Sequence, residues 1–185
     1  MKHFILLILL ITLYSCGLYR PLFIKTDTGR QAIRETYRLS NRESKFSNLI
    51  DTTLVYLSER DYVISNQKGK LIEPEHVYYD FIRFSNNGVM FFSSLSFEKL
   101  TDADYNSLEK GQYCFYTIEQ DILKIEIYNF DTNMFEYQYG RIQENGDILF
   151  FKKAGRSWWT YKGKLNNLYR KTPANLKFSL VFPIR

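Results

Sequence analysis

The residues best suited to binding chemistry lie between Lys152 and Lys171, where aromatic side chains are interleaved with seven basic residues and no acidic residue occurs. Cationic groups beside aromatic faces suit an anionic or sugar-like ligand, through charge-assisted hydrogen bonds, cation–π contacts and stacking. The sequence therefore predicts a site for a small molecule or a glycan. The candidate binding residues are Arg156, Trp158, Trp159, Tyr161, Tyr137 and Tyr139.

The same stretch has a second interpretation that needs no ligand. One tryptophan would fill the core of the domain, because large aromatic side chains are mostly core residues. The cations would then form a solvated face that balances the acidic first half of the domain. An open, aromatic-lined cavity would favour the ligand-binding interpretation, and a core filled by side chains would favour the other.

Residues for catalysis or metal binding are scarce. Beyond Cys16, a zinc site of histidine and cysteine would have only His76 and Cys114, whereas zinc needs three or four ligands. A Gly-x-Ser-x-Gly elbow and glycine-rich phosphate loops are missing. We therefore expect no enzyme, metal or cofactor, with a spatial pair of carboxylates for glycoside hydrolysis left open. Cys114 lies among aromatic residues and is predicted to be a buried, inert thiol.

The net charge of +5 is concentrated near the N-terminus. Between residues 20 and 45, seven basic residues face three acidic ones, so the remaining body is close to neutral and a nucleic-acid partner is not expected. Four arginines recur every fourth residue and would lie along one drifting helical face, suited to an anionic membrane surface. A solvated, partly helical linker is the alternative. These arginines are Arg30, Arg34, Arg38 and Arg42.

From residue 48 onward the hydrophobic periodicity is that of strands. Residues 122–130 place Leu123, Ile125 and Ile127 on one face, which is typical of a half-buried strand. Asn-Gly pairs at residues 87–88 and 145–146 predict tight hairpins, because both residue types accept a positive φ. Eight or nine short strands, the last two at 157–165 and 176–182, predict a mainly β fold: an antiparallel up-and-down barrel or a sandwich.

The first sixteen residues have the parts of an export signal: Lys2, an apolar run over 4–13 and the small Ser15 before Cys16. That run is too short to span a membrane, which needs about 20 apolar residues. Its end, Leu13-Tyr14-Ser15-Cys16, resembles the lipobox of bacterial lipoproteins, although Tyr14 is larger than is usual there. The resemblance implies cleavage before Cys16 and a lipid on that cysteine. Two or more acyl chains give stable anchoring.

Gly17 follows the cysteine, where the lipoprotein sorting pattern places an aspartate for the inner membrane. An outer-membrane location on the periplasmic face is therefore the expectation. The domain organisation predicted from the sequence is a signal peptide at 1–15, a lipidated basic tether at 16–47 and a β domain at 48–185.

The meander over residues 76–182 resembles the lipocalin-like, or calycin-like, domains of small bacterial lipoproteins in its hairpin order and aromatic strands. It departs from lipocalins in lacking Gly-x-Trp on the first strand, since Trp158 and Trp159 come late. The resemblance implies the fold alone. Two functions follow as expectations: a lipid-anchored domain that binds a small apolar or anionic ligand in the cell envelope, or an interaction protein that docks an unknown envelope partner.

Overall fold

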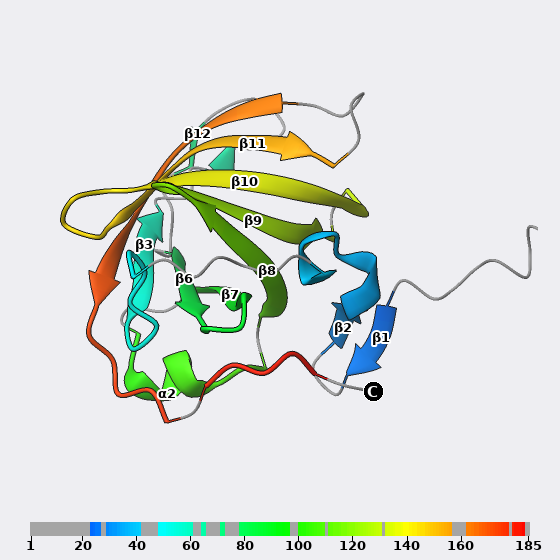
Figure 1. The fold of residues 1–185 in the computed structure, drawn as a ribbon, viewed down its shortest axis with the longest axis horizontal. Helices are drawn as coiled ribbons and strands as arrows, with labels where there is room; N and C mark the ends of the chain where they lie inside the picture. The colour runs from blue at the N-terminus through cyan, green and yellow to red at the C-terminus, as the bar shows by residue number, and fades with distance from the viewer. Residues whose placement is uncertain are drawn as a thin grey trace, which may run out of the picture.

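The computed structural model of the chain describes residues 23–26, 29–41, 48–60, 64–65, 71–72, 78–96, 100–109, 111–130, 132–156, 162–177 and 179–183. Eight antiparallel strands close into a barrel, each paired with the next in chain order, and the last strand pairs with the first (Figure 1). The strands are β3 (Val55–Arg60), β6 (Tyr78–Phe84), β7 (Val89–Ser96), β8 (Gln112–Glu119), β9 (Ile122–Asn129), β10 (Met134–Ile142), β11 (Ile148–Gly155) and β12 (Lys162–Thr172).

Among the described residues, two small hairpins and three short helical segments accompany the barrel. The hairpins are β1 (Phe23–Thr26) with β2 (Gly29–Ala32), and β4 (Ile64–Ser65) with β5 (Leu71–Ile72). The helical segments are the 3-10 turns η1 (Arg34–Thr36) and η2 (Leu39–Asn41) and the α-helix α2 (Asp102–Asn106). The predicted mainly β fold is confirmed, and of the two predicted architectures the structure has the closed up-and-down barrel.

Both hairpins predicted from Asn-Gly pairs are present. Gly88 has φ 79° in the β6–β7 turn, and Gly146 has φ 83° in the β10–β11 turn. Because glycine adopts positive φ without steric cost, these positions set the register of the flanking strands.

The predicted last strand, 176–182, is wrong: the described residues 176–177 and 179–182 form no strand. The apolar alternation there is real, since Leu180 and Phe182 are buried and Val181 is exposed. The backbone N–H of Lys177, however, donates to the side chain of Asn106 in α2 at 2.9 Å. Periodicity reports which side chains are buried, whereas a strand also requires a backbone partner. The strand that closes the barrel is β12.

The barrel interior is filled by side chains from the inward faces of all eight strands. Tyr56, Phe84 and Tyr116 pack edge to face at one end, with ring centroids 5.2 and 4.9 Å apart. Further along, Leu123, Ile125, Ile148 and Phe150 belong to the same buried cluster. The Cys114 thiol is fully buried among them, and burial raises its pKa, as predicted for an inert cysteine.

A second core lies on the outside of the barrel wall. The outward side chains of β3 and of β6 to β10 are covered by the N-terminal segment 29–41, by α2 and by the C-terminal segment 174–183 (Figure 1). The two segments meet over β8, where Phe182 stacks on Phe115 at 5.0 Å and lies 6.1 Å from Tyr37. The domain thus buries apolar surface on both sides of one sheet.

The N-terminal segment 29–41 falls within the predicted tether but differs from a solvated linker. Ala32, Tyr37 and Leu39 are at most 3% exposed and belong to the outer core. Three apolar side chains are enough to hold the segment on the barrel, because the barrel wall supplies the rest of the apolar surface. The sequence of the segment has no hydrophobic period that would reveal this contact.

The approach of β8 to β7 requires a glycine at residue 111. A Cβ there would stand 2.4 Å from Phe91 Cζ and 2.4 Å from the carbonyl oxygen of Phe92. We expect Gly111→Ala to destabilise the protein by about 1–3 kcal/mol, because a backbone atom must move. Urea denaturation should show a lower midpoint with an unchanged slope.

Gly163→Ala is the control for this prediction. Its Cβ would meet only the flexible methylene groups of Lys153, the nearest at 3.1 Å. A loss of stability for Gly111→Ala no greater than that for Gly163→Ala would contradict the close approach of β7 and β8.

Candidate functional site

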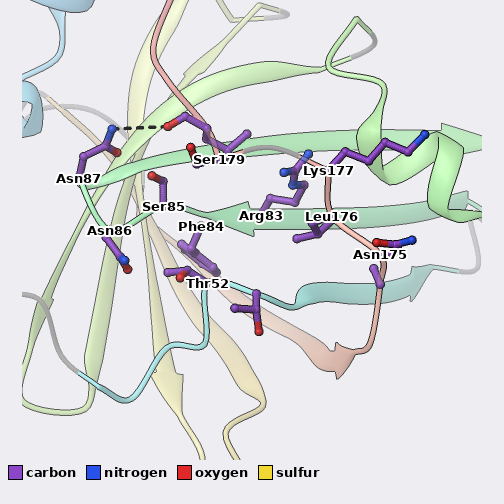
Figure 2. A pocket seen from close by; sticks show the side chains of 13 residues that line it. Thr52, Arg83, Phe84, Ser85, Asn86, Asn87, Asn175, Leu176, Lys177 and Ser179 are labelled. Carbon is purple, nitrogen blue, oxygen red and sulfur yellow. Dashed lines mark hydrogen bonds between the residues drawn. The ribbon is translucent and has the colours of Figure 1, made fainter.

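A cleft of about 750 Å³ opens between the C-terminal segment and the end of the barrel where β6 turns into β7 (Figure 2). Residues from three separate parts of the chain line it. The described lining residues are Thr52, Thr53, Arg83, Phe84, Ser85, Asn86, Asn87, Ala174, Asn175, Leu176, Lys177, Ser179 and Leu180.

The C-terminal segment forms one wall of the cleft because α2 and the β6–β7 turn hold it at both ends. Asp102 in α2 accepts a hydrogen bond from the backbone N–H of Asn175 at 3.1 Å, and Asn106 donates to the carbonyl of Asn175 at 2.8 Å. At the other end, the Asn87 side chain donates to the carbonyl of Leu180 at 3.4 Å, the contact dashed in Figure 2.

Helix α2 is itself fixed by a capping box. The Asp104 carboxylate accepts hydrogen bonds from the backbone N–H and the hydroxyl of Thr101, at 2.8 and 2.7 Å. The helix therefore presents Asp102 and Asn106 to the C-terminal segment in a fixed orientation.

Arg83 is the buried cation of the cleft. It lies on the outer face of β6 beneath the C-terminal segment, with Ser85 on one side and Leu176 on the other (Figure 2). Its side chain is 2% exposed, and its Nη1 donates to the carbonyl oxygen of Tyr105 at 3.0 Å. Burial lowers the pKa of the guanidinium.

The remaining polar groups of the cleft are cationic or neutral. Lys177 is exposed at its rim, and asparagine amides and serine or threonine hydroxyls line the rest, with no acidic residue among the 13 described lining residues. Two positive charges among neutral hydrogen-bond donors create a positive potential in a concave site. This arrangement can bind a carboxylate or a phosphate, because a guanidinium fork matches both groups.

A second polar cluster lies inside the barrel. Asp80 and Glu136 are at most 5% exposed and face the interior from β6 and β10, which are four strands apart in the eight-strand ring. The Tyr169 hydroxyl donates to Asp80 at 3.4 Å, and the Gln138 amide donates to Glu136 at 3.1 Å. Each carboxylate therefore accepts a hydrogen bond from a side chain, Asp80 from one on β12 and Glu136 from one on β10 itself.

Arg156, a predicted ligand-binding residue, contacts the N-terminal segment instead of a cavity. Its Nη1 donates to the carbonyl of Thr36 at 2.5 Å and lies 3.5 Å from the Glu126 carboxylate. The guanidinium carbon lies 4.8 Å from the centroid of the Phe135 ring. Since Glu126 is fully buried, the positive charges of Arg156 and Arg38 both stabilise its carboxylate.

Tyr137 and Tyr139, also predicted to bind ligand, point outward from β10 and so do not line the barrel interior. Lys124 places its Nζ 4.0 Å from the Tyr137 ring centroid, and Lys152 lies 4.9 Å from that of Tyr139. The structure therefore brings Tyr137 toward Glu126 and Arg156 rather than toward a cavity, and burial raises the pKa of its hydroxyl. The predicted residues Trp158, Trp159 and Tyr161 lie outside the described residues.

The four arginines of the N-terminal segment have different surroundings. Arg34 is exposed, with its guanidinium carbon 5.9 Å from the Phe115 ring centroid, and Arg38 is exposed after η1. The backbone of Arg30 belongs to β2. Arg42 lies outside the described residues, as do Cys16 and His76. A regular row of four arginines on a helix is not present, because residues 29–41 form a strand and two 3-10 turns.

Sequence reasoning missed the cleft and its two cations. Arg83 sits in an apolar strand and Lys177 in a segment mistaken for a strand, about ninety residues further along the chain. The one signal in the sequence is Arg83 itself, a charged residue at a position of β6 where the alternation of the strand predicts an apolar side chain.

Searches for metal sites and membrane spans found none among the described residues. No group of three or more His, Cys, Asp or Glu side chains could hold a metal ion there. No helix in that part of the chain is long and apolar enough to cross a bilayer.

Comparisons with known proteins give no family to which this chain can be assigned. No family model matches it, and neither the curated proteins nor the solved structures yield a match.

Proposed function

We propose that this chain is a lipid-anchored protein of the cell envelope whose β-barrel binds a small anionic ligand in the cleft of Arg83 and Lys177. The observation that carries the proposal is a buried guanidinium beside a concave site with no acidic residue among its described lining residues. A bound carboxylate or phosphate would accept charge-assisted hydrogen bonds from the cations of the cleft.

The size and polarity of the cleft favour an anionic ligand over an apolar one. Small-molecule sites typically have volumes of about 300–1,000 Å³, and this cleft falls within that range. Its walls carry the amides of Asn86 and Asn175 and the hydroxyl of Ser179, which suit the oxygen atoms of a ligand. An apolar ligand would need a cavity in the barrel, whose interior is occupied by aromatic and aliphatic side chains.

The predicted lipid on Cys16 would hold this site at the periplasmic face of the outer membrane. Residues 17–22 then separate the lipid from β1. Anchoring would confine the domain to the membrane surface and leave the barrel to carry the binding function. The alternative proposal is an interaction protein that docks an envelope partner and binds no small molecule.

The Lys177→Gln variant tests the anionic cleft without disturbing the core, because Lys177 is exposed at the rim. We expect it to weaken binding of inorganic phosphate or succinate by about three- to tenfold, the effect of losing one charge-assisted contact. Isothermal titration calorimetry measures the affinity, and binding should also fall as salt rises.

Lys162→Gln is the matched control, since Lys162 is an exposed lysine on β12 outside the cleft. Glucose serves as a neutral probe of similar size. Equal weakening by Lys177→Gln and Lys162→Gln would contradict a specific cleft. A wild-type protein that binds none of the anions would favour the alternative of an interaction protein.

A further inference from the structure

One part of the barrel wall has a different surface from the rest. The outward side chains of β11 and β12 are not part of the outer core formed with the N-terminal segment, α2 and the C-terminal segment. Along β12, the exposed residues alternate with less exposed ones from Lys162 to Tyr169, as expected for a strand with one face in water. We call the outward wall of β11 and β12 the basic face.

The basic face carries four exposed cations, and no acidic residue occurs anywhere in residues 148–172. Lys152 on β11 is directly opposite Lys164 on β12. Like charges opposite each other on neighbouring strands destabilise a sheet. None of the four forms a salt bridge with another described residue, although Lys152 contacts the ring of Tyr139. The cations are Lys152, Lys162, Lys164 and Arg170.

Apolar side chains are exposed among these cations. Phe151 is 36% exposed and Leu168 39% exposed, and Leu149 lies opposite Leu168 on the same outward face. Arg141 places its guanidinium carbon 5.8 Å from the Phe151 ring centroid and is itself paired with Asp121 at 3.3 Å. The basic face therefore combines unneutralised positive charge with exposed aromatic and aliphatic groups.

We propose that the basic face docks on the surface of an anionic phospholipid bilayer. Its lysines and arginine would contact lipid phosphates, and Phe151 and Leu168 would enter the boundary between head groups and acyl chains. Each basic residue near an anionic leaflet strengthens binding, and buried apolar area adds to this. Charge alone would suit any polyanion, but exposed phenylalanine and leucine side chains gain nothing from a phosphate backbone and gain free energy from lipid.

Vesicle sedimentation tests the proposal with the unacylated chain from residue 17, which keeps every described element. We expect binding to phosphatidylglycerol vesicles and little binding to phosphatidylcholine vesicles. Replacing the four cations of the basic face with glutamine should weaken binding to the anionic vesicles at least tenfold. Phe151→Ser with Leu168→Ser should leave the charge unchanged and still reduce binding severalfold.

The charge-matched control replaces Arg30, Arg34, Arg38 and Arg42 with glutamine, the segment that the sequence suggested for membrane contact. Thermal melting of every variant establishes that it is folded. Equal weakening by the two fourfold variants would overturn the proposal, since only net charge would then matter. Unchanged vesicle binding after Phe151→Ser with Leu168→Ser would also overturn it. So would a protein that does not bind vesicles but binds duplex DNA tightly, with the same affinity in this double variant.

Discussion

Tyr37→Ala is expected to lower the free energy of unfolding by about 3–5 kcal/mol, the usual cost of deleting a fully buried aromatic side chain. The Tyr37 ring is 1% exposed and lies 5.1 and 5.0 Å from the rings of Phe115 and Phe135. Its hydroxyl donates to the carbonyl of Tyr113 at 3.0 Å. Removing the ring would separate the N-terminal segment from the barrel wall. Urea denaturation gives the size of the loss.

Tyr37→Phe separates the contribution of the ring from that of the hydroxyl. It keeps the ring contacts and removes one hydrogen bond, so a cost of about 1 kcal/mol is expected. Arg34→Gln, on an exposed side chain of the same segment, should be nearly neutral. If Tyr37→Ala costs no more than Tyr37→Phe, the N-terminal segment contributes nothing to the stability of the domain.

The second large effect is expected from Arg156→Met, at about 3 kcal/mol, because the change breaks the ion pair with the buried Glu126 carboxylate. Glu126 is fully buried beneath the N-terminal segment, where its Oε2 accepts a hydrogen bond from the backbone N–H of Leu39 at 2.8 Å. The double variant Arg156→Met with Glu126→Gln should be more stable than Arg156→Met alone, since the uncompensated charge is then absent. A double-mutant cycle measures this coupling.

The pH dependence of stability should report the same carboxylate. Burial raises the pKa of Glu126, while the N–H of Leu39 and the charge of Arg156 act in the opposite direction. Between the ordinary glutamate pKa of about 4.3 and the raised native value, the folded state binds more protons than the unfolded state. Glu126 therefore makes stability fall as pH rises through that window, and its effect is constant above it.

This slope distinguishes the variants. Arg156→Met should steepen the fall in stability with rising pH, because losing the cation raises the pKa of Glu126 further. Adding Glu126→Gln should remove the difference between pH 4 and pH 8 that Arg156→Met introduces. Urea titrations at several pH values measure the effect. A pH slope that is unaltered by Arg156→Met would show that the two side chains do not interact in solution.

The barrel was predictable because its signals are local. Alternation at Leu123, Ile125 and Ile127 identifies a strand with one buried face, and the Asn-Gly pairs fix two hairpins within a few residues. Chain order then suffices for an up-and-down closure, since every strand pairs with its sequence neighbour. Alternation alone does not say that the second face of the same sheet is also covered, so the outer core was not predicted.

The candidate site was not predictable, because the contacts that form it join residues far apart in the sequence. Arg83 and Lys177 come together only because α2 binds the C-terminal segment through Asp102 and Asn106, and no spacing in the sequence encodes that contact. Arg156 was chosen for its basic and aromatic neighbours in the sequence. In the structure its cation is engaged by Glu126, thirty residues away, and by Thr36. Charge composition identifies cations but not which of them face a ligand.

The meeting of Tyr37 and Phe182 over β8 has a consequence for how the chain folds. These two residues lie near opposite ends of the sequence, yet their ring centroids are 6.1 Å apart. Contacts of such long sequence separation form late, because closing a long loop costs entropy before the contact forms. As the chain is synthesised from its N-terminus, Phe115 and its neighbours would stay uncovered until Phe182 has been made. The segment around Phe182 thus determines when the aromatic barrel wall is protected from aggregation.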